Sequence, residues 1–129
     1  DDLRSEMCRV AVQITEGIRY EGAGTIEYIL DEDGSFYFLE MNTRLQVEHP
    51  ITEMVTGVDL VRLQIEVAEG RPFSFKQSDL EQKGHAIEAR IYAENPDQDF
   101  LPSVGDIVTV GQPKGSGVRF DCGYQDGNS

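Results

Sequence analysis

The spacing of hydrophobic residues near the N-terminus predicts a helix followed by a strand. Apolar residues recur at intervals of three and four between Asp2 and about Arg19: Met7, Val10, Ala11, Ile14 and Ile18. This spacing is typical of an amphipathic helix, whereas residues 25–30 have the composition of a strand. We expect the apolar side of the helix to pack on the hairpin that this strand begins.

A tight turn and a second, aromatic-rich strand follow. Asp33-Gly34 is a strong signal for a two-residue hairpin turn, and the second strand begins at Phe36. With the turn at these two residues, counting back along both strands places Glu27 opposite Glu40. Like charges that face each other destabilise a hairpin, so this pair becomes favourable with a cation between the carboxylates. A turn displaced by one residue would instead leave an ordinary solvated pair.

Polar side chains occupy every second position where the second strand ends. They are Glu40, Asn42, Arg44, Gln46 and Glu48. In an extended chain this spacing places all five on one face, in line with Phe36 and Phe38. The two aromatic residues indicate that the row begins inside the protein. Because buried charges need partners or metals, the row predicts a functional site.

The residue types in this row favour cation and anion binding. Glu27, Glu40 and Asn42 would supply oxygen ligands only, which suit Mg²⁺ or Mn²⁺ better than zinc. The planar guanidinium of Arg44 matches a small oxyanion such as bicarbonate, and Glu48 is a candidate general base. The residues alone equally allow an ion pair between Arg44 and Glu48 that closes the loop.

Helix-terminus signals follow the polar row. Pro50 is well placed as the first residue of a short helix over 51–56 that Gly57 ends. Asp59 then caps a second helix at about 60–69.

The remaining sequence predicts a second module built from strands. The charged stretch 77–83 marks the boundary between the two modules. Alternating residues predict a strand over 84–93, and we expect further short strands over 106–110 and 118–120. Arg90 in the first of these strands would, on its own, be an ordinary ion-pair partner of a neighbouring glutamate.

The composition excludes several classes of protein. With 11 Lys and Arg against 24 Asp and Glu, the net charge is −13, which argues against nucleic acid or anionic membranes as partners. The two cysteines form no disulfide framework and have no zinc-site spacing. No apolar run approaches the length that spans a bilayer. The chain begins at Asp1 without a methionine, so we expect it to be a piece of a longer polypeptide.

Residues 40–57 resemble the active-site segment of biotin carboxylases, the ATP-grasp components of acyl-CoA carboxylases. The resemblance rests on Glu-Met-Asn-Thr-Arg-Leu-Gln-Val-Glu-His-Pro at 40–50 and Thr-Glu-Met-Val-Thr-Gly at 52–57. Gly-Ala-Gly-Thr at 22–25 and Gly-His-Ala-Ile-Glu-Ala-Arg-Ile at 84–91 match in the same order. Pyruvate and urea carboxylases share most of this pattern. Carbamoyl-phosphate synthetases share the Glu-x-Asn element but not the Gln-Val-Glu-His run.

The resemblance implies an α+β fold in two parts. Residues 1–76 would form the C-terminal half of an ATP-grasp domain, an antiparallel sheet with helices. Residues 77–83 would be a linker, and residues 84–129 would begin the β-rich C-terminal domain. We expect the 129-residue chain by itself to turn over no ATP, because it lacks the N-terminal domain, the glycine-rich ATP lid and the phosphate-binding lysines that such enzymes place upstream.

The resemblance also implies a role for each candidate residue. Glu27, Glu40 and Asn42 match the ligands of the Mg²⁺ or Mn²⁺ ion on ATP. Glu48 matches the base that deprotonates bicarbonate.

The remaining matches concern bicarbonate, which would supply the carboxyl group, and biotin, which would receive it. Arg44, Gln46 and the backbone of Val47 match the bicarbonate cradle. Arg90 matches the cation that stabilises the enolate form of the ureido group of biotin, a role like that of an oxyanion hole.

By resemblance, the intact enzyme uses ATP to activate bicarbonate as carboxyphosphate and then carboxylates biotin on a carrier. The implied partners are a biotin carboxyl carrier domain and a carboxyltransferase, in a homo-oligomer of the bacterial cytoplasm or the mitochondrial matrix. Two alternatives remain open: another ATP-grasp ligase with a different acceptor, and a non-catalytic acidic assembly module.

Overall fold

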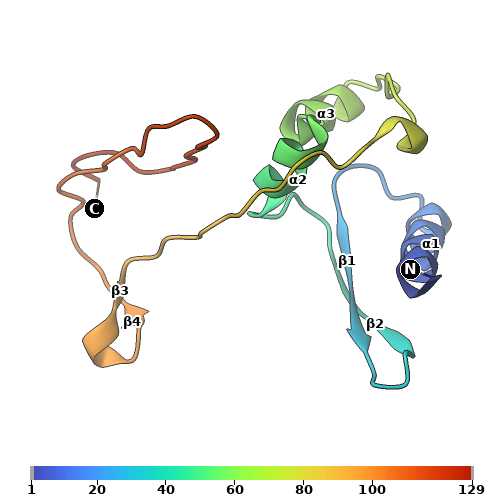
Figure 1. The fold of residues 1–129 in the computed structure, drawn as a ribbon, viewed down its shortest axis with the longest axis horizontal. Helices are drawn as coiled ribbons and strands as arrows, with labels where there is room; N and C mark the ends of the chain where they lie inside the picture. The colour runs from blue at the N-terminus through green and yellow to red at the C-terminus, as the bar shows by residue number, and fades with distance from the viewer. Residues whose placement is uncertain (1, 129) are drawn as a thin grey trace. The chain divides into compact units, whose positions relative to one another are not determined.

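A computed structural model describes residues 2–128. Figure 1 gives the order of its elements: α1 (Asp2–Gly17), β1 (Thr25–Leu30), β2 (Phe36–Asn42), α2 (His49–Thr56), α3 (Leu60–Ala68), β3 (Glu94–Asn95) and β4 (Leu101–Pro102). Short 3₁₀ turns lie at Gln77–Asp79 and Pro96–Gln98. The chain divides into two units, Asp1–Glu88 and Ala89–Ser129. The helices and small antiparallel sheets confirm the predicted α+β class.

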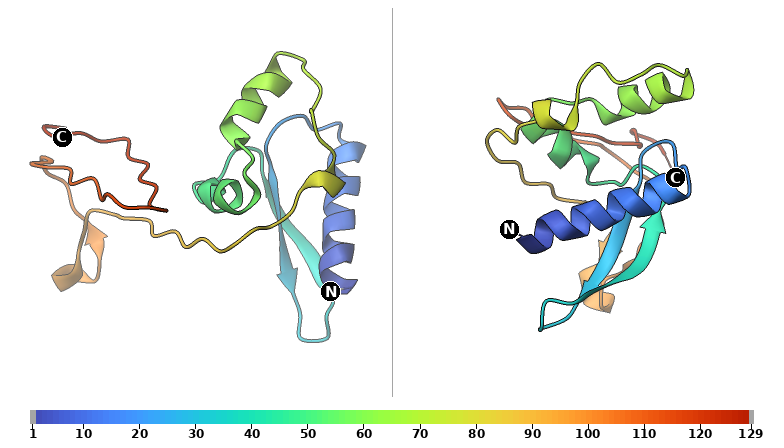
Figure 2. Two further views of the ribbon diagram at one scale, coloured as in Figure 1. Left: turned by 45° about the horizontal axis from the view of Figure 1, so that its top comes forward. Right: turned by 90° about the vertical axis from the view of Figure 1, so that its right-hand side faces the viewer.

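Helix α1 packs along the β1–β2 hairpin, as its apolar spacing predicts (Figure 2). The Tyr28 hydroxyl donates a hydrogen bond to the carbonyl of Met7 in the helix at 3.3 Å. The Tyr28 ring also meets Phe36 edge-on, with 5.1 Å between ring centroids. Burial in this contact raises the pKa of Tyr28. The helix is two residues shorter than expected, and Arg19 just beyond it takes a left-handed φ of 53°.

The connection between β1 and β2 is longer than predicted. Leu30 pairs with Phe36, so the connection runs from Asp31 to Ser35. The backbone N–H of Asp31 donates to the carbonyl of Ser35 at 2.8 Å and closes the loop. The two-residue turn predicted at Asp33-Gly34 is therefore wrong.

A β-bulge in β2 compensates for this longer connection. Tyr28 pairs with Phe38 and Glu27 pairs with Glu40, so Leu39 is an extra residue of β2 at this point. The pairing of Glu27 with Glu40 is therefore confirmed. Two register changes produce it, one at the turn and one at the bulge, and they cancel.

The bulge also places Glu40 on the opposite face of the sheet from Phe38. Residues that pair directly project from the same face. Phe38 shares the face of Tyr28, on the side of α1, whereas Glu40 shares the face of Glu27. The predicted single row from Phe36 and Phe38 through Glu40 is therefore wrong, because it assumed uninterrupted alternation along β2. The acidic pair lies on the face turned away from α1.

Helix α2 ends and helix α3 begins where the sequence predicts, whereas α2 begins at His49, one residue before the predicted first residue Pro50. Gly57 ends α2 with a left-handed φ of 73°, and its N–H donates to the carbonyl of Glu53 at 2.8 Å. Asp59 caps α3, because its carboxylate accepts a hydrogen bond from the N–H of Arg62 at 2.8 Å. In the described residues, no helix combines the length and apolar character needed to cross a membrane.

Removal of the Asp59 cap gives a measurable local prediction. Asp59→Ala in the intact protein is expected to destabilise α3 by about 1 kcal/mol, because the N–H of Arg62 loses its acceptor. Hydrogen exchange of the α3 amides should accelerate about fivefold. Asp59→Asn keeps a side-chain oxygen acceptor and should exchange almost like the parent. Equal exchange in the Ala and Asn variants would contradict the capping role.

The chain beyond residue 83 contains less regular structure than predicted. Its one described sheet pairs Glu94–Asn95 with Leu101–Pro102. The strands predicted over 84–93, 106–110 and 118–120 are wrong, because these segments have no strand assignment. Within residues 2–128 no neighbouring strand pairs with them, and their backbone forms only isolated hydrogen bonds, such as the two that Ile107 makes with Gly127 and Asn128.

Apolar side chains remain exposed in both units. None of the residues in the described part of the chain is fully buried. Ile87 is 86% exposed and Ile91 is 88% exposed, so the alternating apolar residues of this segment contact no core. The hairpin, the loop after β2 and the start of α2 thus hold the candidate site residues on an open surface.

Candidate active site

The side-chain amide of Asn42 lies at the centre of the polar cluster. Its Nδ2 donates to Oε1 of Glu27 at 2.7 Å and, more weakly, to Oε1 of Glu40 at 3.4 Å. The β1–β2 pairing places these two carboxylates opposite each other, and Asn42 pairs with Thr25 at the adjacent end of the ladder. The structure therefore brings together the three residues that the sequence predicts as metal ligands.

The loop after β2 attaches two further predicted residues to this cluster. The guanidinium of Arg44 donates to Oδ1 of Asn42 at 3.2 Å and to the carbonyl of Leu45 at 3.3 Å. The Gln46 amide donates to Oε1 of Glu27 at 3.4 Å. Arg44 and Gln46, which match bicarbonate-binding residues by resemblance, thus contact two of the predicted metal ligands.

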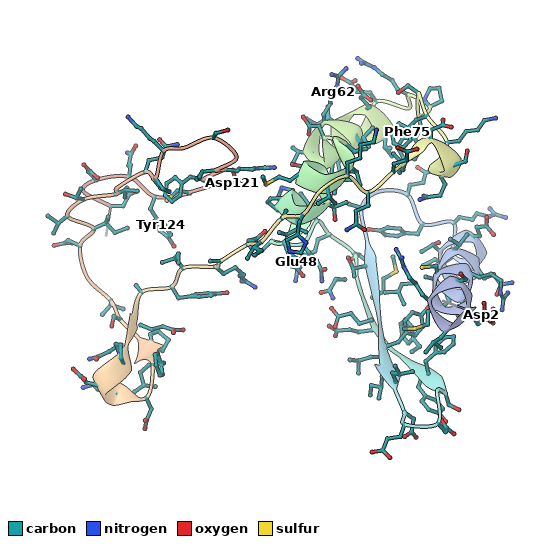
Figure 3. All side chains as sticks on the ribbon, in the orientation of Figure 1. Asp2, Glu48, Arg62, Phe75, Asp121 and Tyr124 are labelled. Atoms are coloured by element: carbon teal, nitrogen blue, oxygen red, sulfur yellow. The ribbon has the colours of Figure 1, made fainter. Side chains whose placement is uncertain are left out.

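Glu48 lies immediately before α2, and Figure 3 labels it there. Its carboxylate is exposed and does not cap the helix. Among the described residues it forms no ion pair with Arg44, so the structure does not support the alternative in which these two residues close the loop. The loop is instead held by His49, whose Nδ1 lies 2.8 Å from the carbonyl of Gln46. Val47 is half-exposed beside it.

Arg44, Gln46 and Glu48 line one pocket of about 370 Å³. The turn 22–24 and apolar residues of α3 also line this pocket. It lies entirely within the first unit. The pocket is therefore a space beside the acidic pair that is lined by basic, amide and carboxylate side chains.

Gly24 lies in close contact with two side chains where the chain enters β1. A Cβ at this position would lie 2.8 Å from Cε of Met41 and 3.0 Å from Cε1 of Tyr20. Gly22, two residues earlier, has a left-handed φ of 114° in the turn from α1 into β1, a conformation that favours glycine.

The acidic pair fits a hard divalent cation. One oxygen from each of Glu27 and Glu40 is directed at a single point, which Nδ2 of Asn42 occupies. Rotation of the amide would place its oxygen beside the two carboxylate oxygens and complete a set of oxygen donors around a cation. Within residues 2–128 no group of three His, Cys, Asp or Glu side chains gathers around a possible metal position. The cation would therefore need further oxygen atoms from water or from another ligand, as Mg²⁺ commonly does.

Arg90 belongs to the second unit. Its guanidinium carbon lies over the Tyr92 ring, 5.1 Å from the centroid, in a cation–π contact. In the described residues it forms no ion pair with Glu88 or Glu94. The role of Arg90 toward biotin stays a prediction.

Two side-chain features, one in the cluster and one outside it, have no signal in the sequence. Sequence spacing gave no indication that Asn42 joins the acidic pair to Arg44, because a side-chain amide can present either of its ends. Glu88 is the second feature: its Oε2 is buried and has no hydrogen-bond partner in the described part of the chain. The alternation of the predicted strand placed Glu88 beside Arg90 but gave no sign of this burial.

The chain matches two protein-family models. Residues 1–76 match the model described as carbamoyl-phosphate synthase L chain, ATP binding domain, and residues 88–129 match the biotin carboxylase C-terminal domain. The chain is 55% identical over 120 residues to a biotin carboxylase of Nostoc sp., which covers 93% of this chain and 27% of that protein. It is also 50% identical over 129 residues to the mitochondrial methylcrotonoyl-CoA carboxylase subunit alpha of Dictyostelium discoideum, covering 99% and 18%.

A solved structure supports the same relationship. The biotin carboxylase domain dimer of 2-oxoglutarate carboxylase from Hydrogenobacter thermophilus, in complex with MgADP, ADP and bicarbonate, is similar with a TM-score of 0.88 and 44% identity. The match covers 98% of this chain and 28% of that chain. These three matches cover 93–99% of this sequence but only 18–28% of each relative. The chain belongs to the biotin carboxylase family of ATP-grasp enzymes.

Proposed function

We propose that the intact protein containing this chain carboxylates biotin with ATP and bicarbonate. The observation that carries the proposal is the convergence of Glu27, Glu40, Arg44 and Gln46 on one hydrogen-bonded cluster around Asn42. A cation position next to an anion-binding pocket is what phosphoryl transfer to a poor nucleophile needs. The chain supplies part of that enzyme, since it spans 27% of the Nostoc relative.

Glu27, Glu40 and Asn42 would hold a Mg²⁺ or Mn²⁺ ion together with ATP. When bound, this ion neutralises charge on the phosphates and favours transfer of the terminal phosphoryl group. The two carboxylates would otherwise repel each other across the ladder. The side-chain amide of Asn42 offsets that repulsion by donating a hydrogen bond to each carboxylate.

Bicarbonate would bind in the pocket beside this cluster. Arg44, Gln46 and the backbone N–H of Val47 would hold its oxygens, and the carboxylate of Glu48 would accept its proton. A bicarbonate oxygen then bonds to the terminal phosphorus of ATP as the bond to ADP breaks, which yields carboxyphosphate and ADP. The exposed position of Glu48 in the described chain leaves its carboxylate available to such a ligand.

Arg90 would stabilise the negative charge that develops on the ureido oxygen of biotin. Biotin would arrive on a carboxyl carrier domain, and a carboxyltransferase would pass the carboxyl group to the final acceptor. We further propose a homo-oligomeric enzyme in the bacterial cytoplasm or the mitochondrial matrix. Residues 1–76 would belong to its ATP-grasp domain, 77–83 to a linker and 84–129 to its C-terminal domain.

Two observables in the intact enzyme test this proposal through Arg90. Arg90→Met is expected to lower biotin carboxylation about 100-fold, the usual effect of removing one group that stabilises an oxyanion. ADP release that depends on bicarbonate alone should persist, because Arg90 takes no part in forming carboxyphosphate. Arg4→Met removes an exposed arginine of α1 and should leave both rates unchanged. Unaltered biotin carboxylation in a folded Arg90→Met enzyme would instead favour a non-catalytic role for this segment.

A further inference from the structure

The amide of Asn42 uses its two ends for opposite partners. Nδ2 donates to the carboxylates of Glu27 and Glu40, at 2.7 and 3.4 Å. Oδ1 accepts a hydrogen bond from the guanidinium of Arg44 at 3.2 Å. The amide therefore links the acidic pair of the hairpin to a cation of the following loop.

A cation between the two carboxylates would not tolerate this orientation. The N–H groups of Asn42 point at the position that the cation would take, and their hydrogens carry partial positive charge. A hard divalent cation needs oxygen donors. The amide would have to rotate by half a turn, so that Oδ1 faces the carboxylates and the cation.

The same rotation would remove the acceptor of Arg44. Nδ2 would then face the guanidinium, and neither an amide NH₂ nor a guanidinium can accept a hydrogen bond. Arg44 would have to leave Asn42. Because Arg44 already lines the pocket with Gln46 and Glu48, its guanidinium would become available to an anion there.

We propose that Asn42 is a positioning residue for Arg44, which it holds in the absence of a cation and releases when a cation binds. This inference rests on the proposed function, because it takes Glu27 and Glu40 as cation ligands and Arg44 as an anion ligand. It implies an order of binding, in which the divalent cation binds first and frees Arg44 to bind bicarbonate in the pocket. Binding of the cation and binding of bicarbonate must then strengthen each other by the same factor.

Asn42→Asp separates this role from simple metal ligation. A carboxylate has acceptor oxygens at both ends and no N–H, so it can bind the cation and Arg44 at the same time. In the intact carboxylase we expect the Kd for Mn²⁺, measured from the electron paramagnetic resonance signal of the free ion, to stay equal or fall. The KM for bicarbonate should rise about tenfold.

Thr43→Asp is the matched control for the added negative charge. Thr43 is exposed, lies between Asn42 and Arg44, and has no part in the proposed machinery. Its carboxylate measures the general repulsion of bicarbonate, which salt screens. A rise in the bicarbonate KM that is equal in the two variants, or a loss of Mn²⁺ binding in Asn42→Asp, would overturn the inference.

Binding in the absence of ATP provides a second measurement. In the parent enzyme, saturating bicarbonate should lower the Kd for Mn²⁺ at least fivefold, within the usual range of coupling between two sites. In Asn42→Asp this factor should fall close to one. No coupling in the parent, or equal coupling in both proteins, would overturn the inference, and the parent measurement holds even if the variant does not fold. Unchanged Mn²⁺ affinity in Glu40→Gln would instead refute the proposed function itself.

Discussion

Replacing Glu48 by Gln in the intact carboxylase is expected to lower bicarbonate-dependent ADP release by a factor of about 100 to 10,000, the range typical for the loss of a general base. The Gln amide has nearly the size of the carboxylate but cannot take the proton of bicarbonate at neutral pH. The Glu48 side chain is exposed and does not cap α2, so the substitution should not disturb the fold. Initial rates of ADP release at saturating ATP and bicarbonate measure the effect.

The Glu48 prediction has a control and a defined contrary outcome. Glu16→Gln makes the same chemical change at an exposed position of α1 and should leave the rate unaltered. Thermal unfolding of the two variants should coincide. A raised KM for bicarbonate with an unchanged kcat would show that Glu48 only binds bicarbonate and that another group takes the proton.

The second large effect is expected at the acidic pair, with opposite signs for binding and stability. Glu40→Gln should weaken Mn²⁺ binding to the intact enzyme at least tenfold and lower ADP release about 100-fold, because the cation loses one of its two charged ligands. Without a cation, the same substitution removes the repulsion between Glu27 and Glu40. The cation-free hairpin should therefore become more stable by about 0.2–1 kcal/mol.

Two measurements on one variant test this pair of signs. Mn²⁺ titration gives the binding loss, and hydrogen exchange of the β1 and β2 amides without metal gives the stability change. Glu32→Gln, in the connection between the strands, removes a carboxylate of the same hairpin away from the pair and should alter neither quantity. In Glu40→Gln, Mn²⁺ binding as tight as in the parent or tighter would contradict a shared cation site. Faster hydrogen exchange of the metal-free hairpin would contradict repulsion between the two carboxylates.

Local signals in the sequence predicted the helices and their termini well. The periodicity of α1, Gly57 and Asp59 each act within a few residues, so one sequence is enough to identify them. Pairing across the sheet depends instead on the turn and on bulges. The predicted facing of Glu27 and Glu40 was correct although the turn was not, because the bulge at Leu39 offset the error.

The remaining failures concern contacts that no local pattern encodes. The strand expected over 84–93 has the right alternation but no partner strand in the described residues. The orientation of the Asn42 amide depends on Glu27 and Arg44, one on a neighbouring strand and one in a loop. Sequence spacing predicted that these residues lie close together, but it could not determine which atom of the amide faces which partner.

The extra residue at Leu39 has a consequence for how this hairpin can vary among related proteins. It divides the strand pair into a segment next to the connecting loop and a segment at the base. The alternation of side chains between the two faces of the sheet shifts by one residue between these segments. Insertions or deletions in the loop at the tip can be absorbed at the bulge before they reach the base. The hairpin can therefore change its length at the distal end while Glu27 and Glu40 keep their mutual position.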